Sequence, residues 1–125
     1  AGLLGAAALP AQQPEPAKFV RYAHVANDGT IAFTYHDDIW VANADGSSPR
    51  RLTAHVARDY MPRFSPDGRW IAFTSNRLGN DDVYVVPVSG GEPKQLTWWS
   101  GADQAVAWTP DGREVIMSSA RGQSA

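Results

Sequence analysis

The sequence predicts an all-β fold in which blades of four short antiparallel strands follow one another, as in part of a β-propeller. Two observations predict it. A unit of about 40 to 44 residues occurs twice and begins a third time, which is the period of a propeller blade. Each copy also divides into short β-branched and aromatic runs separated by turn residues, with no helical periodicity after residue 20. We therefore expect two blades plus the start of a third, a fragment of a larger propeller.

The repeat is marked by a recurring turn. The first and second copies are offset by 39 residues at this turn, and the second and third by 44. The copies cover about residues 21–55, 60–98 and 105–125, the last incomplete. The turn residues that recur are, in chain order, Asp28, Gly29, Ser65, Pro66, Asp67, Gly68, Pro110, Asp111 and Gly112.

The turn in "FSPDGRWIAFTS" (64–75) has the residue types that a tight turn needs. Pro66 fixes φ at the second turn position, and Gly68 accepts a positive φ at no steric cost. The hydroxyl of Ser65 can accept a hydrogen bond from a backbone N–H of the turn. These roles favour a structural over a catalytic function for Ser65.

The run that follows, residues 70–75, predicts a strand with two apolar faces. Ile71 and Phe73 lie on one face, and Trp70 and Ala72 on the other. Such a strand suits a position between neighbouring blades. An open stack of few blades is expected to expose strand edges and faces that carry Trp70, Ile71 and Phe73.

The other strands of the second copy follow from the same signals. Residues 82–88 are expected to form the third strand. Its ladder pairing should end at Pro87, because proline donates no ladder hydrogen bond. Residues 93–98 are expected to form the outer strand. The length difference between the copies falls in a loop at 76–80, and the first copy has its last turn at 44–47.

The N-terminus differs in composition from the rest. Residues 1–13 begin with eleven uncharged, mostly small or apolar residues and then turn polar, which is typical of the back half of a secretory signal peptide. Residues 14–20 read as a linker, and 21–125 as the partial propeller. This start favours a periplasmic or secreted location. The alternative is an alanine-rich tail with no role in export.

Composition excludes several classes of function. The net charge is −2 and the eleven Lys and Arg residues are scattered, so no basic surface for nucleic acid is expected. There is no cysteine, which excludes disulfides, cysteine-ligated metals and thiol nucleophiles. The apolar N-terminal run is too short to span a bilayer.

Catalytic, cofactor-binding and metal-binding motifs are not found in the sequence. No G-x-S-x-G elbow surrounds any serine. The three histidines are isolated, without the spacing of a zinc site, and no D-x-D-x-D-G series indicates calcium. We therefore assign no catalytic, cofactor-binding or metal-ligating residue to this chain.

Four residues are candidates for contact with a peptide at the propeller rim: His36, Asp37, Asp38 and Trp99. "HDD" (36–38) groups a histidine and two carboxylates at a predicted hairpin tip. The structural alternative is that both carboxylates favour the turn and keep its tip solvated; Asp-Asp recurs at 81–82 without a histidine, which favours that alternative. The tryptophans are expected in the core, although Trp98 and Trp99 should face opposite ways, so that one of them can be exposed.

The segment "FSPDGRWIAFTS", with the "DVYV" and "GGEPKQLT" that follow it, resembles the repeat of Tol-system β-propeller proteins. Propellers of prolyl-oligopeptidase-type and tricorn-type serine peptidases carry similar repeats. The opening blade with "DDIW" and a third copy that has "WTPDG" in place of "FSPDG" are most similar to the tricorn type. The resemblance covers about residues 19–120.

This resemblance implies a propeller scaffold that gates substrate for an exported tricorn-like serine peptidase acting on peptides, with the catalytic domain further along the parent chain. The alternatives are a non-enzymatic, Tol-system-like periplasmic propeller that binds proteins, or a propeller fused to an amidohydrolase or prolyl-oligopeptidase core. The implied partners are peptides or proteins and the downstream domains of the same chain. The parent can also be a homo-oligomer. No partner is a nucleic acid, and no cofactor is implied.

Overall fold

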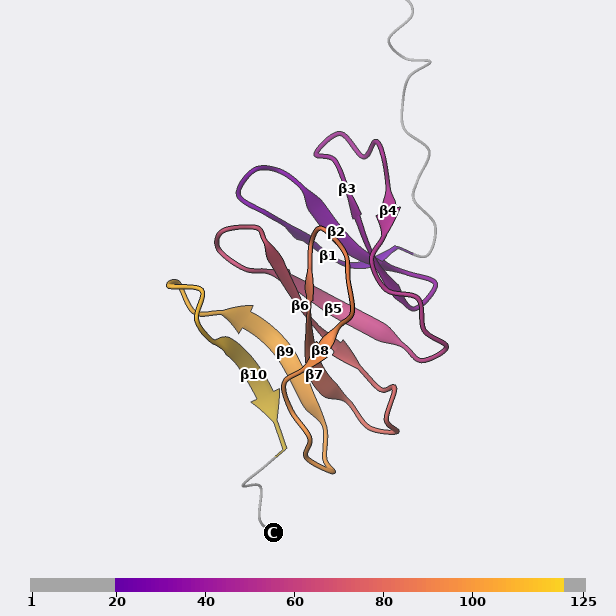
Figure 1. Cartoon of the computed structure of the whole chain (residues 1–125), viewed down its shortest axis with the longest axis vertical. Helices are drawn as coiled ribbons and strands as arrows, with labels where there is room; N and C mark the ends of the chain where they lie inside the picture. The colour runs from indigo at the N-terminus through magenta and orange to yellow at the C-terminus, as the bar shows by residue number, and fades with distance from the viewer. Residues whose placement is uncertain (1–19, 121–125) are drawn as a thin grey trace, which may run out of the picture.

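A computed structural model describes residues 20–120, which form ten β-strands (Figure 1). No helix occurs in this part of the chain, and so none that could cross a membrane. The predicted signal-like segment 1–13, the linker up to residue 19 and residues 121–125 of the third repeat lie outside the described residues. The strands are β1 (Arg21–Val25), β2 (Ile31–Tyr35), β3 (Asp38–Ala42), β4 (Arg50–Arg51), β5 (Asp59–Phe64), β6 (Trp70–Ser75), β7 (Asp82–Pro87), β8 (Lys94–Gln95), β9 (Asp103–Trp108) and β10 (Val115–Ser119).

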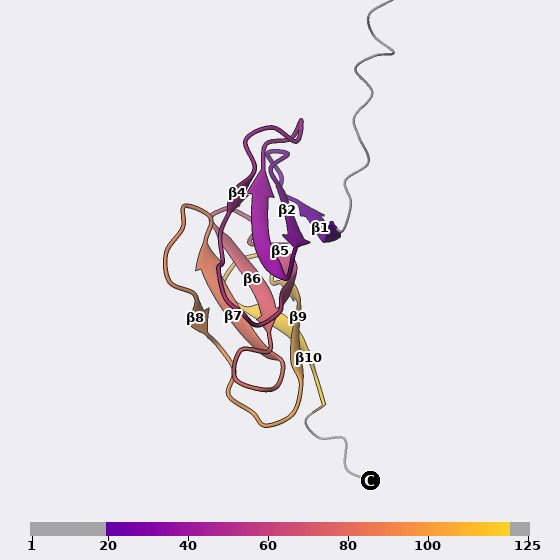
Figure 2. The ribbon, with the colours of Figure 1, turned by 90° about the vertical axis from the view of Figure 1, so that its right-hand side faces the viewer.

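The strands form three antiparallel sheets in chain order. The first sheet has the order β1-β2-β3-β4, the second β5-β6-β7-β8, and the third contains β9 and β10 alone. The sheets follow one another like successive blades, as the two views show (Figures 1 and 2). The predicted fold class, two four-stranded propeller blades and the start of a third, is therefore confirmed.

The main core lies between the first and second blades. Ile39 and Val41 of β3 belong to the same buried cluster as Ile71, Phe73 and other residues of the second blade. The opposite face of β6 carries Ala72, which joins a second cluster that reaches β9. Strand β6 is thus covered on both faces, as its two apolar faces predict.

The recurring turn is built as the sequence predicts. The amide of Gly68 donates to the carbonyl of Ser65 at 2.9 Å, and Gly68 has a φ of 72°. The Ser65 hydroxyl accepts the Trp70 amide at 3.0 Å and donates to the Asp67 carboxylate at 2.7 Å. In the third blade Thr109 makes the equivalent bonds. Ser65 is therefore a structural residue of this turn.

A threonine after each short outer strand closes its blade. The Thr53 hydroxyl accepts the Ile39 amide at 2.9 Å, and the Thr97 hydroxyl accepts the Val83 amide at the same distance. Thr97 also donates to the buried Asp82 carboxylate at 3.2 Å. The outer strand predicted over 93–98 is only two residues long. After it, the Leu96 amide donates to the Val83 carbonyl at 2.7 Å, so that backbone and side-chain bonds together hold this end of the blade.

The expectation that the tryptophans form core is wrong for Trp70, and of the Trp98-Trp99 pair, for which one exposed side chain was expected, both are exposed. Trp98 is 71% exposed and Trp70 is 41% exposed, and Trp99 is exposed as well. Trp98 and Trp99 follow β8 in a loop, so strand alternation does not turn one of them inward. Trp40 and Trp108 are half-buried.

The exposed apolar side chains of the blades lie mostly at other positions than predicted. Ile71 and Phe73 are fully buried between the first two blades, and of the three residues expected there only Trp70 is exposed. The exposed apolar side chains of the last sheet come instead from β9 and β10: Val106, Ile116 and Met117.

Candidate functional site

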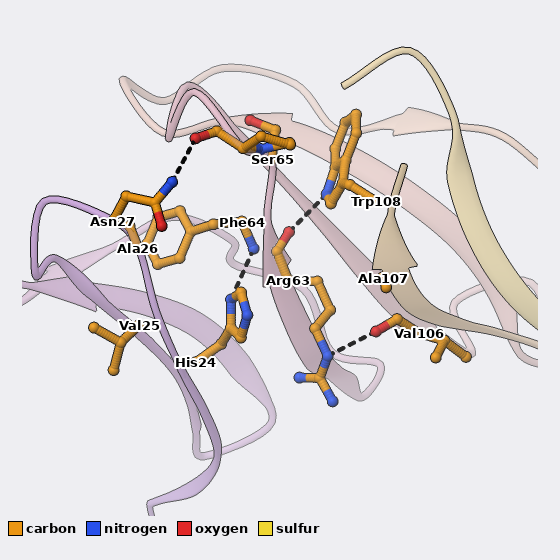
Figure 3. A pocket seen from close by; sticks show the side chains of 11 residues that line it. His24, Val25, Ala26, Asn27, Arg63, Phe64, Ser65, Val106, Ala107 and Trp108 are labelled. Atoms are coloured by element: carbon orange, nitrogen blue, oxygen red, sulfur yellow. Dashed lines mark hydrogen bonds between the residues drawn. The ribbon is translucent and has the colours of Figure 1, made fainter. Parts of the chain in front are cut away.

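A cavity of about 290 Å³ opens where the first strands of the three sheets come together. Strand β5 packs against both β1 and β9, and the cavity lies at the C-terminal ends of these three strands (Figure 3). Because the first strand of each blade surrounds the central passage of a propeller, we take this cavity as the candidate site. Its lining residues are His24, Val25, Ala26, Asn27, Arg63, Phe64, Ser65, Pro66, Val106, Ala107 and Trp108.

Hydrogen bonds between blades hold the cavity walls together (Figure 3). The Phe64 amide donates to Nδ1 of His24 at 3.0 Å, which joins the first and second blades. The indole N–H of Trp108 donates to the Arg63 carbonyl at 2.9 Å, which joins the second and third. The His24 ring also stacks on the Phe64 ring, with centroids 5.9 Å apart. The site is therefore formed by three blades jointly.

A β-bulge precedes the cavity in each of the first two inner strands. The pairing register shifts just before His24 in β1 and just before Arg63 in β5. Tyr22 and Met61, one residue into each shift, have positive φ values of 55° and 58°. A left-handed, non-glycine residue in a strand is strained, and bulges redirect the side chains that follow them. The bulges thus help to set the direction in which His24 and Arg63 point.

The cavity presents hydrogen-bond donors. The Arg63 guanidinium donates from Nε to the Val106 carbonyl at 2.9 Å and from Nη1 to the Pro62 carbonyl at 2.8 Å. Burial, and secondarily the charge of Arg63, lowers the pKa of His24 below its ordinary value. Because Nδ1 of His24 accepts a hydrogen bond, the neutral ring carries its proton on Nε2. Both side chains therefore suit a ligand with carbonyl or carboxylate oxygens.

The described residues hold no arrangement for covalent or metal chemistry at this site. Ser65 uses its hydroxyl within its own turn, and no histidine hydrogen-bonds to it among residues 20–120. No group of three or more possible metal ligands occurs in this part of the chain. The site can bind and orient a ligand through hydrogen bonds and apolar contact.

The "HDD" stretch lies at a different place: His36 and Asp37 form the hairpin turn between β2 and β3, and Asp38 is the first residue of β3. His36 and Asp37 both have positive φ, 48° and 65°, as in the two-residue turn that suits a right-twisted hairpin. With Arg21 and Thr34 they line a second cavity of about 200 Å³. Their proposed contact with a peptide stays a prediction.

The two carboxylates of "HDD" have different surroundings. Asp37 is exposed, as predicted for a solvated tip. Asp38 is buried, and its carboxylate pairs with Arg51 and accepts the His55 amide at 3.3 Å. The expectation of a solvated tip is therefore wrong for Asp38.

Trp99, the fourth rim candidate, lies outside the two cavities described above and lines a separate one of about 420 Å³, together with Leu96, Thr97, Trp98 and Met117. Its carbonyl accepts a hydrogen bond from Asn80 at 2.9 Å, and its ring packs directly over Gly101. Trp99 thus covers the loop between β8 and β9. Its role as a peptide contact stays a prediction too.

Sequence reasoning did not single out His24 or Arg63. They lie 39 residues apart and match no motif of their own. One signal could have found them. His24 and Arg63 occupy the same position of the repeat, which is Ala107 in the third copy, so this position varies while the turn residues recur. A variable position on the inner strand is where a function specific to this protein can be placed.

Comparisons with known proteins agree with this architecture. The family model of the tricorn protease N-terminal beta propeller domain matches residues 17–125. Tricorn protease homolog 1 of Streptomyces coelicolor is 40% identical over 67 residues, which cover 54% of this chain and 6% of that protein. A TolB homolog of Chlorobium luteolum is 41% identical over 51 residues, which cover 41% of this chain and 12% of that protein.

Solved structures have the same fold. The crystal structure of the tricorn protease matches with a TM-score of 0.69 at 28% identity, covering 80% of this chain and 11% of that one. TolB from Acinetobacter baumannii matches with a TM-score of 0.72 at 28% identity, covering 84% of this chain and 28% of that one. This chain thus spans a small part of each relative's length. Since the family model covers residues 17–125, the chain belongs to the tricorn protease N-terminal β-propeller domain family.

Proposed function

We propose that this propeller segment is the substrate-gating scaffold of an exported, tricorn-like serine peptidase that acts on peptides. The observation that carries the proposal is the cavity on the inner strands, in a chain of the tricorn N-terminal propeller family. Its donors and its aromatic walls suit an extended peptide, whose backbone offers carbonyl oxygens along its length. The catalytic serine and histidine are assigned to a part of the parent protein outside this chain.

Export is part of the same proposal. Residues 1–13 have the composition of a signal peptide's apolar region and cleavage site. We propose a periplasmic or secreted location for the parent protein. Cell fractionation of the tagged gene product tests this, and retention in the cytoplasm would contradict it.

A second function has its own support. Segments of a TolB homolog and of a TolB structure match this chain about as well as tricorn proteins do, with 41% identity and a TM-score of 0.72 respectively. A non-enzymatic propeller that binds a protein partner on the same inner surface is therefore the competing proposal. The same blades serve both functions, because function depends on the site and not on the fold.

Two experiments separate these functions. The reading frame that contains this chain should encode a serine-peptidase core if the first proposal is right. The purified gene product should then hydrolyse fluorogenic peptides, and a serine-directed fluorophosphonate should abolish this activity. A gene product that ends after one closed propeller and captures a protein without cleaving it would support the second proposal.

A further inference from the structure

We propose that one edge of this segment rests on a phospholipid membrane surface, with Val56, Leu78 and Trp98 inserted among the lipid headgroups. The edge consists of three loops, residues 54–58, 76–80 and 98–102, which we call the apolar loop edge. This contact is peripheral, because side chains on loop tips reach only the interfacial layer of a bilayer. The inference goes beyond the proposed peptide function and does not depend on it.

The three loops lie side by side at the same end of the strands. Figure 1 shows them along the lower right of the molecule, with the recurring turns along the opposite edge. The Asn76 amide donates to the Arg58 carbonyl at 3.2 Å, and the Arg58 amide donates to Oδ1 of Asn76 at 2.9 Å. The Asn80 side chain donates to the carbonyls of Trp99 and Gly101 at 2.9 and 3.0 Å. The middle loop is thus tied to both of its neighbours, and the three loops form one surface.

Each loop presents a large apolar side chain to solvent. Val56 is fully exposed, Leu78 is 63% exposed, and Trp98 is the most exposed tryptophan among residues 20–120. Leu78 belongs to the stretch that makes the second copy of the repeat longer than the first. Apolar side chains gathered on one edge in this way indicate a surface that is covered when the protein is at work.

The exposure of Trp98 does not come from the incomplete third sheet. Its position in the repeat, 44 residues earlier, is Ala54. Ala54 and the following His55 are exposed, although the second sheet next to them has all four strands. The blade architecture therefore leaves this position open to solvent, and this chain has a tryptophan there.

Exposed negative charge is concentrated at the other end of the strands. At the end with the apolar loop edge, Asp37 is the one exposed acidic residue of the described part of the chain, and it lies 3.9 Å from Nε of Arg58. A membrane surface that contains anionic lipids is negatively charged, so it repels the opposite end and admits the apolar loop edge. The exposed acidic residues of the opposite end are Asp28, Asp45, Asp67, Glu92, Asp111 and Glu114.

Side chains suited to the headgroup layer lie beside the apolar tips. Tyr22 is exposed, and its ring lies 5.6 Å from that of Tyr60. The Arg58 guanidinium lies 4.1 Å from the centroid of the Tyr60 ring and donates to the Tyr22 hydroxyl at 3.2 Å. Tyrosine and tryptophan are enriched where a bilayer meets water, and arginine is attracted to anionic headgroups.

The shape of the apolar loop edge favours a membrane over a protein partner. Val56, Leu78 and Trp98 stand on three separate loops and point into solvent. A folded protein would need a matching pocket for each of them, because protein interfaces are packed as closely as interiors. A bilayer surface is fluid and accepts protruding apolar side chains at any spacing.

The test measures binding of the full gene product that contains this chain to vesicles of phosphatidylcholine and phosphatidylglycerol. Cosedimentation gives the partition coefficient for the wild type and for W98S, L78S, W98F and W70S. W70S is the matched control, because it removes an exposed tryptophan at the opposite end of the strands. Quenching of tryptophan fluorescence by vesicles with brominated phosphatidylcholine is the second readout.

The wild type should sediment with the vesicles, and W98S should lower the partition coefficient about tenfold, because an inserted apolar ring is lost. L78S should lower it several-fold for the same reason, and W70S should leave it unchanged. W98F keeps an apolar ring, so it should still bind, but its quenching by brominated lipid should be weaker than that of the wild type.

A wild type that stays in the supernatant would overturn the proposal, and so would equal losses for W98S and W70S. Quenching as strong in W98F as in the wild type would place another part of the protein at the membrane and would overturn it as well. Absent vesicle binding, with a protein partner captured by the wild type but not by W98S, would assign the edge to a protein interface instead. If W98S fails to fold by circular dichroism, L78S and the quenching of W98F decide.

Discussion

At the scale of single residues, a buried ion pair secures the second blade. The Asp59 side chain is fully buried, and Nη2 of Arg77 donates to both of its oxygens at 3.0 and 2.9 Å. The guanidinium also lies over the Tyr84 ring, 4.8 Å from its centroid. Buried pairs of this kind add little net stability while intact, but breaking one leaves an uncompensated charge.

We therefore predict that R77M lowers the free energy of unfolding by about 3–5 kcal/mol. Denaturation of the gene product, followed by tryptophan fluorescence, measures the loss. The R77M/D59N double variant should recover part of it, because the buried charge is then gone. An exposed control, R113M, should change stability little; equal losses for R77M and R113M would contradict the role of the pair.

His24 makes the stability of the blade junction depend on pH. Its folded-state pKa lies below the ordinary value, so as pH falls through about 6.5 the unfolded chain takes up this proton more readily than the folded one. Protonation also removes the acceptor for the Phe64 amide. Stability should therefore decrease with acidification, from about pH 6.5 down to the folded pKa.

The H24N variant checks this pH dependence, since an asparagine oxygen can accept the same amide hydrogen bond without titrating near neutrality. Thermal melts from pH 7.5 to 5 should show a smaller decrease in Tm for H24N than for the wild type. An unchanged pH dependence in H24N would show that another group is responsible.

At the scale of elements, each complete blade ends in a very short outer strand that is followed by a threonine with buried hydrogen bonds. Strands β4 and β8 have two residues each, whereas Thr97 satisfies the buried Val83 amide and the buried Asp82 carboxylate. Thr53 accepts the equivalent amide, that of Ile39. The recurring Leu-Thr of the sequence is thus a structural signature.

We predict that T97V destabilises the protein by about 1–3 kcal/mol, because an isosteric methyl group leaves a buried amide without its acceptor. T97S keeps the hydroxyl and should cost less. Chemical denaturation of both variants measures the difference. Equal losses for T97V and T97S would mean that packing, and not the hydroxyl, holds this position.

The elements themselves could be predicted from the sequence, whereas the site could not. The turn at Ser65, the strand at 70–75 and the burial of Phe73 follow from local signals of turn chemistry and alternation. The meeting of His24 with Arg63 depends on two bulges and on how blades stack. The burial of Asp38 was not predicted either, because it depends on an ion pair with Arg51, 13 residues further along the chain.

At the scale of the whole molecule, the third sheet is incomplete in the described part of the chain. Strand β10 pairs with β9 alone, and Ile116 and Met117 on it are exposed. An unpaired strand edge beside apolar surface favours pairing with another chain. This geometry fits one sector of a larger closed propeller.

We accordingly predict that the isolated 125-residue chain self-associates or fails to fold cooperatively. Light scattering after size-exclusion chromatography gives its mass, and a thermal melt gives its cooperativity. A monomer that melts in one sharp transition would contradict the view of this chain as one sector of a propeller.

The central claim is that the inner-strand cavity is where this propeller holds peptides. The most direct measurement attaches a bulky maleimide to V25C, at the cavity, and to V56C, on the exposed loop after β4; this chain has no native cysteine. Labelled wild-type gene product controls for cysteines elsewhere. Label on V25C should weaken peptide binding about tenfold or more, as expected for blocking a buried contact, while label on V56C should not. Undiminished binding to labelled V25C would contradict the claim.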